Sequence, residues 1–165
     1  MTLRKPMFPS SKHQGPGLYA LVRNTEVYQA LKSAGLAALI YAPGDFRAGK
    51  LAETLRHLDA DSIVALPPQM RDASLEEAFQ LISAVGHRLM ISNVSQLVLP
   101  HSRPFLVGEG IPVWNAHAAR VVRELGAAGI CLSRELSGCE AQELEDDALE
   151  WILPVYGRAA VMLLN

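Results

Sequence analysis

Cysteine is scarce in this chain, and this scarcity excludes two classes of protein. Of the 165 residues only two are cysteine, Cys131 and Cys139. Two cysteines are too few for a disulfide framework, or for the roughly four thiolates that hold an iron–sulfur cluster. We therefore expect no cofactor in this chain by itself.

Basic surplus and long apolar runs are also missing. The 15 Lys and Arg residues do not outnumber the 17 Asp and Glu residues, which argues against a dedicated nucleic-acid-binding protein. Half of the residues are hydrophobic, but no apolar run approaches the ~20 residues of a membrane span. The first residues show no hydrophobic block of the signal-peptide kind. We therefore expect a cytoplasmic protein without a membrane partner.

Several motifs of catalytic and metal chemistry are absent as well. No GxSxG sequence occurs, and none of the five histidines lies at a metal-ligand spacing such as HExxH, so we expect no metal site. Gly108 and Gly110 form a GxG without a third glycine, which favours a simple turn. Cys131 lies in an apolar run without a basic neighbour, as a small core residue would.

The remaining sequence divides into an arm and one domain. Residues 1–17 contain three prolines, two glycines and no periodic apolar pattern, which is typical of a flexible arm or linker. Residues 18–165 form the predicted domain, in which short apolar runs alternate with helical patterns. The runs begin at Leu18, Ala37, Ser62, Arg88, Pro104, Gly129 and Trp151.

Helix boundaries are indicated by capping residues. Ser74 with Glu77 and Ser137 with Glu140 have capping-box spacing, and Asn115 is a favourable N-cap. The helix after Asn115 is predicted to bury Ala118, Val121, Val122 and Leu125. The acidic stretch 140–150 is predicted to be a solvated helix face.

This alternation predicts an α/β fold with parallel strands covered by helices. A doubly wound sheet and a (β/α) barrel both fit, but seven units without a glycine-rich phosphate loop after the first strand favour a TIM-like barrel. About seven strands leave that barrel incomplete, with two open edges. We expect the edges to be covered by self-association, a loop or a neighbouring domain, in an oligomer or in part of a longer protein.

Candidate site residues follow the predicted strands, because ligands of parallel α/β folds gather at the carboxyl ends of strands. Glu135 is the candidate catalytic acid or base, since it is a strand-end carboxylate with a basic neighbour. The candidate substrate-binding residues are Arg23, Asn93, Asn115, Ser133, Arg134, Tyr156 and Arg158.

Structural roles are the alternative for the same residues. The strand-end arginines can pair with nearby carboxylates, and Glu135 can lie in the first turn of a helix, where its charge suits the helix dipole. Asn24, Asn93 and Asn115 are favourable helix caps, and a cap can also bind a ligand.

Two long segments carry a family resemblance. VWNAHAARVVRELGAAGICLSREL, from Val113, and ILPVYGRAAVML, from Ile152, resemble the collagenase-like peptidase family, number thirty-two in the series of peptidases of unknown catalytic type (U). LVRNTEVYQAL, IVALPPQMRD and ISNVSQL are similar to parts of that family's C-terminal barrel module. The likeness covers nearly all of the chain after Gly17.

The resemblance implies a (β/α) barrel and a hydrolase, a protease or collagenase. Other members resemble oxygen-independent hydroxylases that carry an iron–sulfur cluster and act on RNA bases or the ubiquinone ring. The positions that match the family motifs are Asn93, Asn115, Ser133, Glu135, Leu136 and Gly157.

The chain departs from the family near the seventh strand. Where the family has a glutamate, an aromatic residue, a histidine and a later cysteine, this chain offers Ile152, Pro154, Tyr156 and Ala160. Three hypotheses follow. The chain is a peptidase domain acting on a peptide or a small molecule, a non-catalytic barrel module that binds a partner, or part of an iron–sulfur hydroxylase whose cluster cysteines lie outside this chain.

Overall fold

Seven parallel strands, alternating with helices, form one sheet in the computed structural model, which describes residues 17–101, 103–144 and 148–157. The strands are Tyr19–Val22 (β1), Ala38–Tyr41 (β2), Ile63–Ala65 (β3), Arg88–Ile91 (β4), Phe105–Val107 (β5), Ala127–Cys131 (β6) and Glu150–Ile152 (β7). The helices are Thr25–Leu31 (α1), Ala48–Leu55 (α2), Asp72–Val85 (α3), Ala116–Glu124 (α4) and Gly138–Gln142 (α5), with a 3-10 helix, Val94–Val98 (η1). The predicted α/β class and the seven parallel strands are confirmed.

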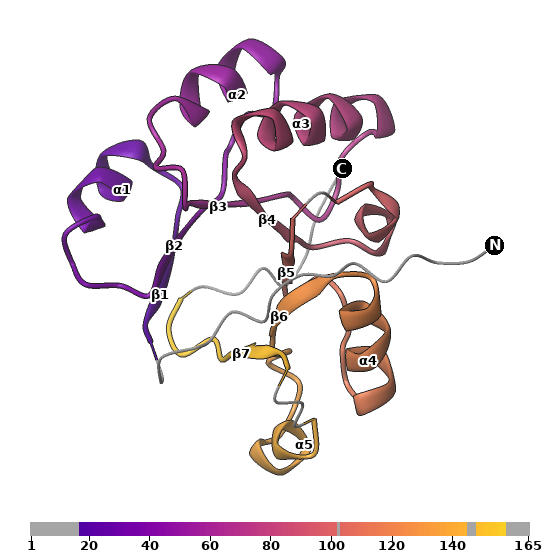
Figure 1. Cartoon of the computed structure of the whole chain (residues 1–165). Helices are drawn as coiled ribbons and strands as arrows, with labels where there is room; N and C mark the ends of the chain where they lie inside the picture. The colour runs from indigo at the N-terminus through magenta and orange to yellow at the C-terminus, as the bar shows by residue number, and fades with distance from the viewer. Residues whose placement is uncertain (1–16, 102, 145–147, 158–165) are drawn as a thin grey trace.

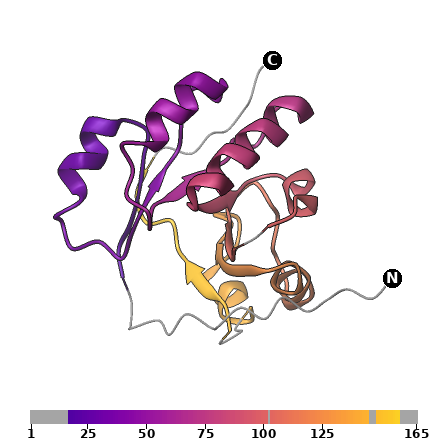
Figure 2. The same ribbon diagram turned by 45° about the horizontal axis from the view of Figure 1, so that its top comes forward.

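The sheet curls into an incomplete TIM-like barrel. Strands that follow one another in the chain pair side by side, in the order β1 to β7. The helices lie on the outer side of the curled sheet (Figure 1), and a second view shows the same arrangement (Figure 2). Within the described residues β1 and β7 pair on one side only, so the sheet has the two open edges that the sequence predicts.

Side-chain alternation along the strands produces two apolar layers. Outward residues such as Val64, Ile91 and Val107 pack with helix residues in the larger cluster. Inward residues form a smaller cluster of Ile40, Ile63, Ala65, Met90, Leu106 and Cys131. The continuous apolar runs of the central strands arise because both faces of these strands are buried.

A polar contact joins the first and last strands across the inner face. Glu150 is in register with Gly129, which is in register with Leu106 of the inner cluster. The hydroxyl of Tyr19 donates a hydrogen bond to the carboxylate of Glu150, although β1 and β7 are not paired. Burial and the bond to Glu150 raise the pKa of Tyr19. This contact bridges the open side of the barrel.

Three helix predictions differ from the structure. Helix α3 begins at Asp72, with Arg71 as N-cap, so Ser74 is not its cap. Helix α5 ends at Gln142 and Glu150 belongs to β7, so no helix spans 140–150 in the described residues. On α4, Ala119 and Val122 are buried, whereas Val121 is 55% exposed. The predicted buried face of α4 is therefore too wide.

The other caps lie where the sequence places them. Asn115 caps α4, and Ser137 with Glu140 forms a capping box at α5. The predicted arm lies outside the described residues, apart from Gly17. Helices with the length and apolarity of a membrane span do not occur in the part of the chain that the structure describes.

Candidate functional site

The predicted site residues lie at one end of the barrel, on the loops that follow the strands. We call these loops, residues 23–24, 42–47, 66–71, 92–93, 108–115, 132–137 and 153–157, the strand-end rim. Arg23 follows β1, and Tyr156 follows β7 and is 99% exposed. Arg158 lies outside the described residues. The rim brings the remaining candidates to one side of the molecule, on the three neighbouring loops after β4, β5 and β6.

Asn93 and Asn115 are helix caps, as the structural alternative predicts. The Asn115 side chain accepts a hydrogen bond from the N–H of Ala118 at 2.9 Å. The Asn93 side chain accepts from the N–H of Ser95 at 2.9 Å, and its amide nitrogen donates to the carbonyl of Pro68 at 2.7 Å. Both side-chain oxygens therefore bind backbone N–H groups, and the amide nitrogen of Asn93 binds a backbone carbonyl as well.

A buried glutamine, which sequence reasoning missed, completes this part of the rim. Gln96 accepts hydrogen bonds from the N–H groups of Ser92 and Asn93 and donates to the carbonyl of Pro67 at 2.8 Å. Its side chain is 1% exposed, so it fixes the loop after β3 to the loop after β4. The sequence does contain a signal for this role, since Gln at the third position after an N-cap completes a capping box.

An ion pair joins the next two loops. The guanidinium of Arg134, after β6, donates to the carboxylate of Glu109, after β5, at 2.8 Å. This is the carboxylate pairing that the structural alternative predicts for strand-end arginines. Because both side chains are partly exposed, the pair contributes about 1 kcal/mol or less to stability. It does hold the two loops together beside the inner face.

Glu135 lies in an exposed turn, not in the first turn of a helix. Its N–H donates to the hydroxyl of Ser133 at 3.3 Å, while α5 begins only at Gly138. The carboxylate is therefore free to meet solvent and a bound molecule. The first-turn alternative for Glu135 is wrong, because the chain makes a turn and then a separate capping box at Ser137.

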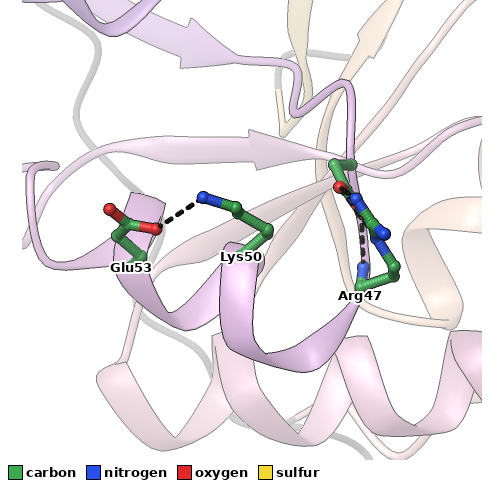
Figure 3. A network of polar contacts seen from close by, with 4 residues as sticks. Arg47, Lys50 and Glu53 are labelled. Atoms are coloured by element: carbon green, nitrogen blue, oxygen red, sulfur yellow. Dashed lines mark hydrogen bonds and ion pairs between the residues drawn. The ribbon is translucent and has the colours of Figure 1, made fainter.

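A hollow of about 410 Å³ lies farther along the rim, between the loops after β2 and β3. Its lining includes Asp45, Phe46, Arg47, Met70, Arg71 and Glu77. Arg47 forms a double ion pair with Asp45, through Nε at 2.9 Å and Nη2 at 2.5 Å. These bonds and the N–H of Arg47 lower the pKa of Asp45 to about 2. Figure 3 shows Arg47 at the start of α2, and Lys50 paired with Glu53 one turn along.

The helices beside this hollow lack side-chain caps. Arg47 and Arg71 are the N-caps of α2 and α3, and neither makes a side-chain bond to the first turn. Asn24, Asn93, Asn115 and Ser137 do make such bonds at the other helix starts. The N–H groups of an uncapped first turn attract carboxylates, and so do arginines. The hollow therefore suits an anionic group next to a neutral or basic one.

The described residues offer neither an activated Cys131 thiol nor a cluster of metal ligands. Burial, and secondarily the charge of Glu109, raise the pKa of the Cys131 thiol to about 12. The thiol is therefore a core group, as its apolar run predicts. No group of three or more His, Cys, Asp or Glu side chains among the described residues could hold a metal ion.

Comparison with known proteins identifies no relative. Neither a protein-family profile, nor a curated protein, nor a solved structure matches the chain. The arrangement of the rim is therefore the basis on which function is argued.

Proposed function

We propose that this chain is the barrel module of a hydrolase of the collagenase-like peptidase type, with a peptide substrate lying along the strand-end rim. Peptide hydrolysis joins water to the scissile carbonyl carbon, and the peptide C–N bond breaks as the nitrogen takes up a proton. Glu135 is the residue assigned to move that proton, because its carboxylate is exposed on the rim. General acid–base catalysis of this kind contributes about 10²- to 10⁴-fold to a rate.

The observation that supports this proposal is the hollow at the ends of β2 and β3. Active sites of (β/α) barrels lie at the carboxyl ends of the strands, and this hollow lies at that end. It presents Arg71 and the first turn of α3 to a carboxylate, and Glu77 to a basic group. A peptide carries both kinds of charge. The family resemblance of the segments after β5 and β7 agrees with the same assignment.

The test is cleavage of fluorescently labelled gelatin by the purified chain. Glu135→Gln is expected to lower the rate at least about 100-fold, since it removes the titrating group. Glu143→Gln is the matched control, because Glu143 is an exposed glutamate at the end of α5 and not on the loops of the rim. Equal urea midpoints for the three proteins would show that folding is unchanged. Cleavage that Glu135→Gln leaves intact removes Glu135 from the mechanism.

Binding at the hollow is tested separately from catalysis. Arg71→Ala is expected to raise KM about tenfold, as loss of one charge-assisted hydrogen bond does. Arg120→Ala, which removes an exposed arginine from α4, is expected to leave KM unchanged. Unchanged KM in Arg71→Ala contradicts the role of the hollow, and an inactive wild-type chain contradicts a peptidase that acts alone.

A non-catalytic module that binds a partner is the second candidate, and the open edges favour it. Leu21 of β1 is 53% exposed, while Leu153 and Val155, after β7, are 64% and 74% exposed. Unpaired strand edges with apolar neighbours are ready to pair with another chain or domain. We propose that self-association, or a neighbouring domain, covers them.

Light scattering after size exclusion tests this candidate. A dimer at micromolar concentration is expected, and Leu21→Lys is expected to convert it to a monomer. Val98→Lys is the control, since Val98 is an exposed valine on η1, away from both edges. A wild-type chain that is strictly monomeric contradicts self-association through the edges.

A further inference from the structure

A buried histidine lies at the end of the barrel opposite the strand-end rim. His87 follows Gly86, the left-handed C-cap of α3, and directly precedes β4. The residue is 4% exposed, and neither ring nitrogen makes a hydrogen bond with the described residues. A buried imidazole without partners is uncommon, because a buried polar group ordinarily has at least one.

The surroundings of His87 disfavour a positive charge. The ring borders a cavity of about 10 Å³, together with Phe79, Ser83, Leu89, His101 and Arg103. Burial is the main cause that lowers the pKa of His87, and the positive charge of Arg103 lowers it further. The carbonyl groups of Leu55, Asp59 and Ala60 face the ring and favour its charged form, but without hydrogen-bond geometry, and burial outweighs them.

The other groups that face this cavity do not supply a counter-charge. His101 binds the carbonyl of Gln96 through Nε2 at 2.9 Å, and burial lowers its pKa as well. The carboxylate of Asp59 is bound by Lys32 at 2.6 Å. Helix α3 contributes Ser83, which is uncharged, and the loop before β5 contributes Arg103. A proton on His87 therefore meets no carboxylate at this cavity, and the nearby carbonyl groups do not offset burial and the charge of Arg103.

We propose that His87 makes this end of the barrel sensitive to acid, because protonation of its imidazole loosens the packing of α3 and of residues 101–105 against β4. The elements that open are those that border the cavity. The ring centroid of His101 lies 4.3 Å from that of Phe105, with the rings tilted, and 5.6 Å from that of Phe79, with the rings edge to face. These ring contacts join α3 to the start of β5, so a charge beside them disturbs both.

The direction of the effect follows from proton linkage. The unfolded chain holds its histidine protons below about pH 6.5, whereas folded His87 gives up its proton at a lower pH. The contribution of neutral His87 is therefore complete above pH 6.5 and is lost as the pH falls below it. The opening equilibrium is therefore expected to rise between pH 7.5 and 5.5, by at most about tenfold for one histidine.

The experiment compares urea unfolding and amide protection at pH 7.5 and 5.5. In the wild type, protection factors of Leu89, Met90 and Ile91 are expected to fall by up to about tenfold, and the urea midpoint to fall with them. His87→Gln is expected to reduce this pH dependence, whatever its own stability, and to leave the share that belongs to His101, whose pKa is lowered too. His117→Gln replaces an exposed histidine on α4, and is expected to behave as the wild type does.

If His87→Gln does not fold, NMR of the wild type tests the proposal instead. The ring-proton NMR signal of His87 in the wild type is expected to stay at its neutral position while the chain is folded. An ordinary titration near pH 6.5 in the folded chain overturns the proposal. An equal loss of protection in wild type and His87→Gln overturns it as well.

Discussion

Gly129 shows how one residue positions an edge strand. A Cβ atom at Gly129 would lie 2.9 Å from both the Cβ and the carbonyl oxygen of Glu150, and 3.0 Å from a methyl group of Leu106. Gly129→Ala is therefore expected to push β7 away from β6 and to lower the free energy of unfolding by about 2 kcal/mol. Urea unfolding measures the change.

Gly138→Ala is the matched control for that substitution. No atom lies within 4 Å of a Cβ at Gly138, and the residue is the first of helix α5. Alanine favours a helix over glycine, so the control is expected to be neutral or slightly stabilising. Equal losses in the two variants would show that crowding against β7 is not the cause.

The two cysteines are expected to differ sharply in reactivity. Cys131 is buried, with its pKa raised to about 12 by that burial, while Cys139 is exposed. A thiol reagent needs the thiolate and access to it. At pH 8 the folded chain is expected to react rapidly at Cys139 alone, and at both thiols in urea. Rapid labelling of Cys131 in the folded chain would contradict its place in the inner core.

Single residues were predictable where the signal is local. Asn115 caps a helix and Cys131 packs in a core, as their neighbours in the sequence indicate. The pairing of Arg134 with Glu109 was not predictable, since it joins two loops 25 residues apart. Glu109 carries no pattern that distinguishes it from any exposed glutamate.

At the scale of an element, the N-cap of α4 can be compared with a serine that is no cap. Asn115→Ala removes the bond to the N–H of Ala118 and is expected to lower the free energy of unfolding by about 1 kcal/mol. Ser74→Ala lies inside α3, where alanine is the better helix former, and is expected to cause no loss. Thermal unfolding of both variants is the measurement. A comparable loss in Ser74→Ala would show that Ser74 does cap the helix.

Strands were easier to predict than helix ends. Each apolar run in the described residues became a strand, because burial on both faces requires apolar residues at successive positions. The start of α3 was missed because Arg71 makes no side-chain cap and so leaves no capping signal. The prediction of a helix over residues 140–150 was wrong because Leu149 packs in the larger core cluster and Glu150 belongs to strand β7.

At the scale of the molecule, the bond between Tyr19 and Glu150 is the contact to remove. Tyr19→Phe is expected to lower the free energy of unfolding by about 1 kcal/mol at neutral pH, and to raise amide exchange in β1 and β7. Because the folded pKa of Tyr19 is raised, this contribution is complete below about pH 10 and is lost as the pH rises above it.

Unfolding of wild type and Tyr19→Phe from pH 7 to 11 measures this difference. The gap between the two proteins is expected to be constant up to about pH 9 and to shrink beyond pH 10. Equal stability of the two proteins at pH 7 would show that packing of the ring, and not the hydroxyl bond, supports the open side of the barrel.

The order of the strands also bears on how the chain folds. Because every strand pairs with its neighbours in the chain, the sheet can form by short loop closures, and no early step has to join the two ends. Each closure spans one crossover between neighbouring strands and not the whole chain. A nucleus can therefore arise in a pair of adjacent units and spread to both edges, and the bond between Tyr19 and Glu150 forms only when both edges are in place.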